Sequence, residues 1–251
     1  MTKLSVVIIT FNEEQNITRC IASVRAIADE IIVLDSFSTD KTCYLAQQAG
    51  ATIVQQVFEG YTLQKQRAVA LAQNDFVFSI DADEAVSDEL RQSILAEKEN
   101  GFAADAYEMN RLNFLGNHPI KTCGLYPDTK IRIWNRTKGG WQGGQVHEQL
   151  VMRQNTSAKK LNGDLLHYTY ATIQDMEQQM EKFARLAAGD LKAENSFFLL
   201  TKMLFSAPFK FLRSYILKAG FTDGAAGLAI CYHQSRGVFL KYYYALQLKK
   251  G

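Results

Sequence analysis

Residues 76–84 read Phe-Val-Phe-Ser-Ile-Asp-Ala-Asp-Glu, and this stretch decides how the rest of the chain is interpreted. Its first half is a short run of aromatic and β-branched residues, which is typical of a buried strand. Its second half places Asp81, Asp83 and Glu84 where that strand ends. On an extended backbone Asp81 and Asp83 point to the same side, and close carboxylates repel each other unless a cation lies between them. A divalent cation with oxygen ligands would satisfy them, although acids are also favoured at the start of a helix, which we expect near Ser87.

Strand-like and helix-like segments alternate four times over the first hundred residues. This alternation indicates βαβ units in a mostly parallel sheet. Neither G-x-G-x-x-G nor G-x-x-x-x-G-K occurs, so a standard dinucleotide site and a P-loop are not expected. Asn12 is a candidate N-cap for the first helix. The predicted strands are residues 4–10, 30–34, 52–57 and 76–80, and the helices between them include residues 17–24 and 63–72.

The pattern changes after Gly101, where loops rich in Gly, Asn and Pro separate shorter strands. We expect one α/β domain over residues 1–171, with halves at 1–100 and 101–171, and a helical region over residues 172–251. In this second part, strands are predicted at residues 106–110, 130–135 and 165–169, and helices at residues 172–191, 196–217 and 236–248.

Composition is that of a globular protein, with 47% hydrophobic and 22% charged residues in 251. The four cysteines are scattered, with no C-x-x-C pair. We therefore expect neither a zinc site nor a disulfide framework, and a reducing compartment fits. The N-terminal residues lack the pattern of a signal peptide.

Charge is divided unevenly along the chain. Residues 195–251 carry eight Lys or Arg against one acid, Asp223, which gives +7 there and leaves −5 for the rest of a chain of net charge +2. Residues 196–213 mix Phe and Leu with Lys and Arg, without the roughly 18 uninterrupted apolar residues of a membrane span. This composition predicts docking on an anionic membrane surface. A helical subdomain packed on the sheet or a dimer interface is the alternative, and nucleic acid is not an expected partner.

Three segments resemble the family 2 glycosyltransferases, which have the GT-A fold. They are residues 7–14 (Val-Ile-Ile-Thr-Phe-Asn-Glu-Glu), 33–40 (Val-Leu-Asp-Ser-Phe-Ser-Thr-Asp) and 79–84 (Ser-Ile-Asp-Ala-Asp-Glu). The resemblance implies a Rossmann-like mixed sheet, with residues 1–100 binding a nucleotide sugar and residues 101–171 on the acceptor side. It also implies a divalent ion, Mg²⁺ or Mn²⁺, and inversion at the anomeric carbon.

Three further segments are similar to bacterial lipopolysaccharide core β-glucosyltransferases. This closer resemblance implies UDP-glucose, or another UDP-hexose, as donor and a heptose of a lipid-linked core oligosaccharide as acceptor. It implies a peripheral place on the cytoplasmic face of the inner membrane. Phe37 departs from the family, which usually has glycine there, and we expect a slightly altered loop. The segments are residues 58–67 (Phe-Glu-Gly-Tyr, then Gln64, Lys65 and Arg67), residues 130–134 leading to 146–148, and residues 166–170.

The resemblance also assigns metal ligands. It makes Asp83 the principal metal ligand, with Asp81 contacting the ribose, the metal or a metal-bound water. His167 follows two leucines and is a candidate third ligand, although a histidine in such a place is commonly part of a core.

Six other residues are assigned to the donor. Asp35 would accept a hydrogen bond from uracil, although an aspartate there also suits a turn. The remaining expectations are that Thr10, Asn12 and Glu13 line the nucleotide pocket or cap a helix, and that Lys65 and Arg67 reach the diphosphate or form a solvated helix face.

Glu148 is the predicted general base for the acceptor hydroxyl, since acids usually serve as base in this family. His147 is the rival, because histidine ordinarily titrates near neutrality. A surface salt bridge is the structural alternative for Glu148. Other functions stay open: a transferase acting on another glycolipid or a surface polysaccharide, a sugar nucleotidyltransferase, or a non-catalytic membrane-docked binder of nucleotide sugars.

Overall fold

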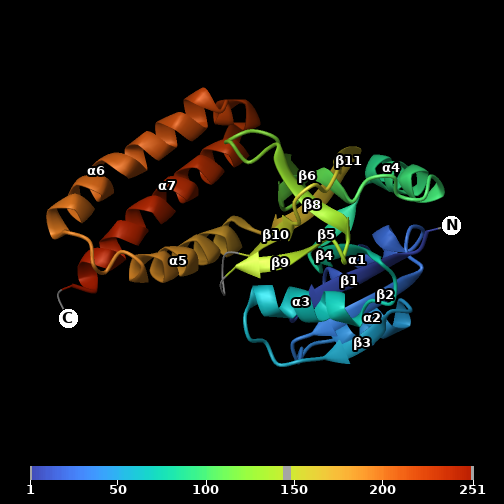
Figure 1. The fold of residues 1–251 in the computed structure, drawn as a ribbon. Helices are drawn as coiled ribbons and strands as arrows, with labels where there is room; N and C mark the ends of the chain where they lie inside the picture. Colours follow the sequence, from blue (N-terminus) through green and yellow to red (C-terminus); the bar gives the residue numbers. More distant parts are fainter. Residues whose placement is uncertain (1, 144–147, 250–251) are drawn as a thin grey trace. The chain divides into compact units, whose positions relative to one another are not determined.

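The computed structural model describes residues 2–143 and 148–249 of the chain (Figure 1). In chain order its elements are β1 (Leu4–Thr10), α1 (Ile17–Val24), β2 (Glu30–Asp35), α2 (Thr42–Gln48), β3 (Thr52–Gln55), α3 (Tyr61–Leu71), β4 (Phe76–Asp81), β5 (Glu84–Val86), α4 (Asp88–Glu99), β6 (Ala106–Leu115), β7 (His118–Ile120), β8 (Asp128–Asn135), β9 (Gly139–Gly143), β10 (Glu148–Met152), β11 (Ala158–Tyr170), α5 (Ile173–Gly189), α6 (Ser196–Leu212), the π-helical turn η1 (Arg213–Leu217), the 3₁₀ turn η2 (Gly220–Asp223) and α7 (Gly224–Gln247).

The chain forms two compact units. Unit 1 contains residues 1–111 and 128–167, and unit 2 contains residues 112–127 and 168–251. The chain therefore leaves unit 1 and returns to it before its final passage into unit 2. The predicted domain boundary after residue 171 lies close to that final passage, and its status as a folding boundary stays a prediction.

Unit 1 is built on a mixed sheet with the strand order β3-β2-β1-β4-β8-β6-β11-β5. β1 pairs in parallel with β2 and β4, and β2 pairs in parallel with β3. β8 is antiparallel to both β4 and β6, and β11 is antiparallel to β5. The carboxyl ends of the parallel strands β1, β2 and β4 share one edge, which is where open α/β sheets bind ligands.

Both faces of the parallel half are covered, because alternate residues of β1 point to opposite sides. Leu4, Val6 and Ile8 pack in one core with side chains of α1, α2 and α4. Val7 packs in a second core with α3 and with Trp141 of β9. A strand buried on both faces needs the nearly continuous apolar sequence that β1 has.

Unit 2 is mainly helical, and α7 is its central helix, since both α5 and α6 pack along it (Figure 1). Met176 of α5 and Ile230 of α7 share one small core. Leu199 of α6 and Ala245 of α7 belong to another. Among the described residues, no helix has the length and apolarity that crossing a bilayer requires.

The predicted fold class is confirmed: a GT-A-like mixed sheet is flanked by helices and followed by a helical C-terminal region. β1 has the predicted ends, and β2 and β4 each run one residue further, to Asp35 and Asp81. Asn12 is not the N-cap of α1, because that helix begins at Ile17 after Asn16. The last helix begins at Gly224, well before the predicted start. Strands β5, β7, β9 and β10 were not predicted.

Candidate functional site

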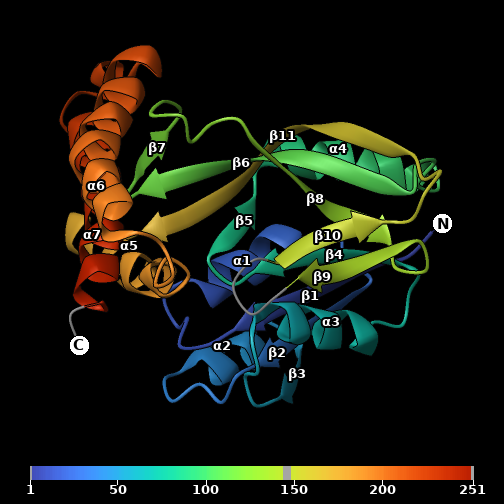
Figure 2. The same cartoon turned by 60° about the vertical axis from the view of Figure 1, so that its left-hand side comes forward.

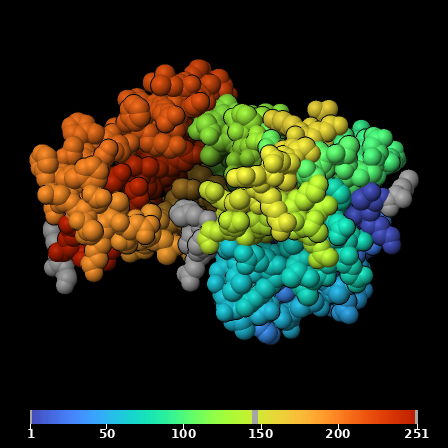
Figure 3. Space-filling model, viewed as in Figure 1, coloured from blue at the N-terminus to red at the C-terminus, as the bar shows by residue number. Residues whose placement is uncertain are grey.

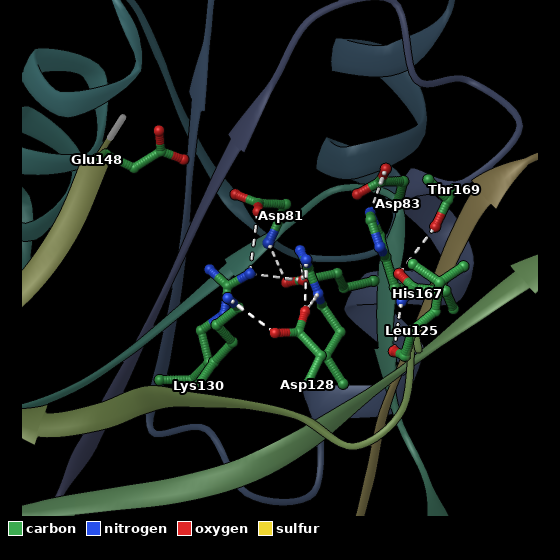
Figure 4. Close-up of polar contacts among 12 residues, drawn as sticks. Asp81, Asp83, Leu125, Asp128, Lys130, Glu148, His167 and Thr169 are labelled. Carbon is green, nitrogen blue, oxygen red and sulfur yellow. Dashed lines mark hydrogen bonds and ion pairs between the residues drawn. The ribbon is translucent and has the colours of Figure 1, made fainter. Parts of the chain in front are cut away.

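The strand β4 ends at Asp81, a turn occupies Ala82 and Asp83, and β5 begins at Glu84. Because of this turn the backbone is not extended from Asp81 to Asp83, so the expectation that their side chains point to the same side is wrong. The two carboxylates meet different partners (Figure 4). Asp83 faces His167, whereas Asp81 faces a cluster of cationic side chains.

Asp81 lies between two buried cations. Its Oδ1 is 3.3 Å from Lys65 Nζ, and its Oδ2 is 3.2 Å from Arg132 Nη2. Burial would raise the pKa of the Asp81 carboxyl, but the positive charges of Lys65 and Arg132 outweigh it and hold this pKa well below its usual range. Asp81 therefore stays ionised at the end of β4.

Arg132 and Glu84 form a buried ion pair that sequence reasoning did not assign. Arg132 Nη2 donates to Glu84 Oε1 at 2.6 Å, and Glu84 Oε2 accepts from the Asp81 backbone N–H at 3.0 Å. Burial raises the pKa of Glu84, against the opposing charge of Arg132. Burial would lower the pKa of Arg132, but the carboxylates of Glu84 and Asp81 raise it overall. The available signal was Arg132 itself, which lies between Ile131 and Ile133 in β8. A buried cation requires a partner.

Lys65 of α3 joins Asp81 to the predicted base. Its ammonium is 3.1 Å from Glu148 Oε1 and lies over the Trp141 ring, 4.7 Å from the centroid. Gln66 Nε2 donates to the Trp141 carbonyl at 2.8 Å, which ties α3 to the hairpin β9–β10. The structure thus brings Lys65, Asp81 and Glu148 together, with Lys65 occupied by two carboxylates.

These residues line a cavity of about 690 Å³ in unit 1. The carboxylates of Glu148 and Asp81 point toward one another across it (Figure 4). His147, the rival base, lies outside the described residues. The cavity is lined by Lys65, Asp81, Arg111, Thr129, Lys130, Ile131, Arg132, Trp141, Glu148, Gln149 and Leu150.

Asp83 and His167 form the second group of predicted residues. His167 Nε2 is 3.1 Å from Asp83 Oδ2. Among residues 2–143 and 148–249, no three His, Cys, Asp or Glu side chains gather as a metal-binding set, and Asp81 does not join this pair. The carboxylate and imidazole fit an ion that takes its remaining ligands from phosphate oxygens and water, as Mg²⁺ commonly does.

Two loops at the carboxyl ends of β1 and β2 hold the residues assigned to the nucleotide. The Asn12 side-chain carbonyl accepts from the Thr39 N–H at 2.9 Å, and the Asn12 N–H donates to Ser38 Oγ at 2.9 Å. These bonds fasten the loop after β1 to the loop after β2. Glu13 lies in the same region, where burial raises its pKa. Thr10 Oγ1 is buried without a hydrogen-bond partner among the described residues.

Asp35 is fully buried and is the acceptor that orders its own turn. Its carboxylate accepts from the Ser38 N–H at 2.9 Å, from the Ser38 hydroxyl and from Gln55 Nε2 at 3.1 Å. These contacts match the turn-forming alternative. Arg67 pairs with Glu59 and does not line the cavity.

Phe37, in the same loop, has φ +62°. Glycine adopts this left-handed region without steric penalty, whereas a residue with a Cβ does not. Phe37, which replaces the glycine usual in the family, therefore occupies a position whose left-handed backbone conformation favours glycine.

Comparison with known proteins relates this chain to glycosyltransferases. Residues 5–152 match the family model for glycosyl transferase family 2. An uncharacterized glycosyltransferase of Rickettsia typhi is 31% identical over 241 residues, covering 90% of this chain and 81% of that protein. The lipopolysaccharide core biosynthesis glycosyltransferase LpsC of Rhizobium meliloti is 29% identical over 230 residues, covering 89% and 84%.

Among solved structures, glucosyl-3-phosphoglycerate synthase from Mycobacterium tuberculosis, in complex with Mn²⁺, UDP and glucosyl-3-phosphoglycerate, is 27% identical with a TM-score of 0.37. The similarity covers 46% of this chain and 45% of that one. The family match spans more than half of the chain and includes the whole Asp81–Lys65–Glu148 group. This chain therefore belongs to glycosyl transferase family 2 and is, by family, an inverting glycosyltransferase.

Proposed function

We propose that this chain transfers a hexose, glucose from UDP-glucose, to a heptose of the lipopolysaccharide inner core. The observation that carries the proposal is the cavity of about 690 Å³, in which Asp81 and Glu148 lie on either side of Lys65. One space therefore contains a carboxylate at the strand end, where nucleotides bind in α/β sheets, and a second carboxylate facing it. An inverting transfer needs a donor and an acceptor held in one such space.

On the donor side, the UDP moiety would lie over the carboxyl ends of β1, β2 and β4. The Asn12–Thr39 contact joins the two loops there, which supports the proposal that Thr10, Asn12 and Glu13 would line the nucleotide pocket. Asp81 would accept a hydrogen bond from a ribose hydroxyl, because its carboxylate stays ionised. Asp83 and His167 would hold Mg²⁺ or Mn²⁺, which neutralises the charge of the leaving diphosphate when bound.

On the acceptor side, Glu148 would take the proton of the attacking hydroxyl. Its position at the start of β10 and its 3.1 Å contact with Lys65 hold the carboxylate in the cavity. Lys65 also contacts Asp81. Its ammonium therefore contacts both the carboxylate proposed for the donor and the carboxylate proposed for the acceptor. His147 stays the alternative base.

Two observations favour a lipopolysaccharide core acceptor. The relative LpsC carries that role in its name and aligns over 84% of its own length. The +7 charge of residues 195–251 suits an enzyme whose acceptor is anchored in a lipid surface. Both observations support a peripheral place on the cytoplasmic face of the inner membrane.

The test is transfer of labelled glucose from UDP-glucose to purified lipopolysaccharide truncated after its first heptose. Glu148→Gln keeps the size of the side chain and removes the base, so we expect kcat to fall roughly a hundredfold or more. Glu99→Gln, an exposed carboxylate at the end of α4, is the matched control and should leave kcat unchanged. Wild-type activity in Glu148→Gln would remove Glu148 from the chemistry, and loss of activity in His147→Asn instead would identify the other base.

A further inference from the structure

The helix α6 is packed on one side only. It lies along α7, and α5 packs against α7 as well (Figures 1 and 2). Leu199 and Ala207 are its buried residues. The opposite face has no covering element among the described residues of unit 2, although most residues of the helix are apolar. A helix of this composition is normally buried.

The exposed face of α6 consists of large apolar side chains. Phe197, Phe205 and Phe209 are 78%, 70% and 63% exposed. Residues 197, 201, 205 and 209 recur at intervals of four, and residues 197, 200 and 204 fill the adjacent row, so these side chains share one face. Figure 3 shows α6, in orange, on an open surface. The exposed apolar residues of this face, which we name the α6 face, are Phe197, Phe198, Leu200, Leu204, Phe205, Phe209 and Leu212.

A contiguous apolar surface of this kind marks an interaction site. The face continues beyond the helix, because Ile216 and Leu217 of η1 are also exposed. Since no described helix meets the requirements of a membrane span, the face suits a partner that covers one side of a helix. A bilayer interface and another protein surface both meet that condition.

The charges around the α6 face select between these two. Lys202 follows Phe198 by four residues and precedes Phe205 by three, so it borders the face, and its ammonium lies 5.4 Å from the centroid of the Phe198 ring. Arg213 and Lys218 are exposed at the C-terminal end.

Acidic charge is nearly absent from this part of the chain. The one acid among residues 195–251 is Asp223, and it is occupied, because its Oδ2 accepts from Thr122 Oγ1 at 2.6 Å. A second copy placed on the same face by two-fold symmetry would bring cations against cations. An anionic lipid surface would instead pair with them.

We propose that the α6 face docks on an anionic lipid membrane, with the helix in the plane of the interface. The aromatic and leucine side chains enter the boundary between headgroups and acyl chains, and Lys202 and Arg213 contact the lipid phosphates. The inference deepens the proposed function and rests on it for its purpose, because docking would hold unit 1 of the enzyme at the surface that carries its acceptor.

The experiment is co-sedimentation of the full-length protein with two kinds of vesicle. One is phosphatidylcholine alone, and in the other about a third of the lipid is phosphatidylglycerol. We expect binding mainly to the anionic vesicles. Phe197→Ser/Phe205→Ser should weaken binding about tenfold or more, and Lys202→Gln/Arg213→Gln should weaken it by a comparable factor at low salt. Tyr44→Ser, an exposed aromatic of α2 in unit 1, is the matched control and should bind as the wild type does.

Calorimetric binding of UDP with Mn²⁺ is measured on each variant to separate docking from the nucleotide site. Docking is supported if the α6 variants no longer bind vesicles but still bind UDP. It is overturned if Phe197→Ser/Phe205→Ser binds vesicles like the wild type. It is also overturned if the protein ignores vesicles and sediments as a dimer that this variant dissociates. Vesicle binding without UDP binding would contradict the proposed function and leave the docking surface standing.

Discussion

Lys65 shows how one residue joins parts of the chain that are far apart in sequence. A buried ammonium is unfavourable unless it is paired, and Lys65 is only 3% exposed. Its partners come from three different strands: Asp81 at the end of β4, Glu148 at the start of β10, and the ring of Trp141 in β9. Within the structure described, its ammonium is therefore committed to two carboxylates, and contact with a diphosphate would require exchange of partners.

Phe37 is a residue whose backbone conformation is unfavourable for its side chain. Its φ of +62° is a conformation that costs a residue with a Cβ about 1 kcal/mol or more and costs glycine nothing. Its side chain is half exposed, so truncation removes little packing. We expect Phe37→Gly to be more stable than Phe37→Ala by about 1 kcal/mol in urea unfolding, although glycine has the more disordered unfolded state.

The control for this comparison is the same pair of substitutions at Tyr44. That side chain is also exposed but lies within α2, where the backbone is helical. Alanine should be the more stable variant there by about 1 kcal/mol. Alanine more stable than glycine at both positions would mean that the loop of Phe37 carries no left-handed strain.

At the scale of the element, periodicity located the parallel half of the sheet almost to the residue. Strands β1, β2 and β4 are buried on both faces, so their apolar runs are continuous and have clear ends. β5 has three residues and exists because it pairs with β11, nearly eighty residues later in the chain. Within the described parts of the chain, β9 and β10 pair only with each other. Gly139, Gly140 and Gly143 of β9 weaken its strand signal.

The same reasoning explains what was predicted of the site. Sequence placed Asp81 and Asp83 correctly at the end of a strand, because that depends on local pattern. The turn at Ala82 and Asp83, which separates their directions, has no such signal. The pairings of Lys65 with Glu148 and of Arg132 with Glu84 connect elements that are far apart in sequence, α3 with β10 and β8 with β5, so they were beyond single-sequence reasoning.

The start of β8 depends on ionic contacts that give a prediction about pH. Asp128 Oδ2 is 2.8 Å from Arg111 Nη2 of β6, and its Oδ1 is 2.9 Å from Lys130 Nζ. Burial would raise the pKa of Asp128, but the hydrogen bond from Lys130 and the charge of Arg111 lower it overall. A carboxyl whose pKa is lowered on folding stabilises the protein above the unfolded pKa and ceases to do so as the pH falls through the folded pKa.

We therefore expect Asp128→Asn to reduce the free energy of unfolding by about 1 kcal/mol at pH 7. The difference from wild type should shrink as the pH falls below the ordinary aspartate range, because the wild-type carboxyl then becomes protonated. Urea unfolding at a series of pH values measures this. Asp75→Asn, at an exposed position before β4, is the control. A difference that is constant with pH would show that the lost hydrogen-bonding geometry matters and the charge does not.

At the scale of the whole molecule, the candidate active site and the proposed docking surface belong to different units. The charged cavity and the Asp83–His167 pair lie in unit 1, and the apolar α6 face lies in unit 2. The net charges of −5 and +7 on the two parts of the sequence follow the same division closely. Carboxylates in unit 1 can bind a cation that neutralises a diphosphate. A basic, aromatic appendage suits an anionic surface.

Both tryptophans of the chain, Trp134 and Trp141, are buried in unit 1, so their fluorescence reports the unfolding of that unit alone. UDP that binds the folded cavity with a divalent ion should stabilise unit 1 by about 2.7 kcal/mol at a hundred times its Kd. We therefore expect UDP with Mn²⁺ to raise the midpoint of the fluorescence-detected thermal transition. UDP alone should raise it less, because Asp83 and His167 can contribute to diphosphate binding only through the ion.

Asp83→Asn should abolish the difference made by Mn²⁺ and leave the weaker effect of UDP. Phe197→Ser/Phe205→Ser in α6 should show the full wild-type response, since these residues belong to unit 2. A Mn²⁺-dependent shift that survives Asp83→Asn would place the ion elsewhere and would leave Asp83 only its contact with His167, because the N-cap of α4 is Ser87. A shift lost in the α6 variant would show that the two units are coupled through nucleotide binding, because no α6 residue lines the cavity.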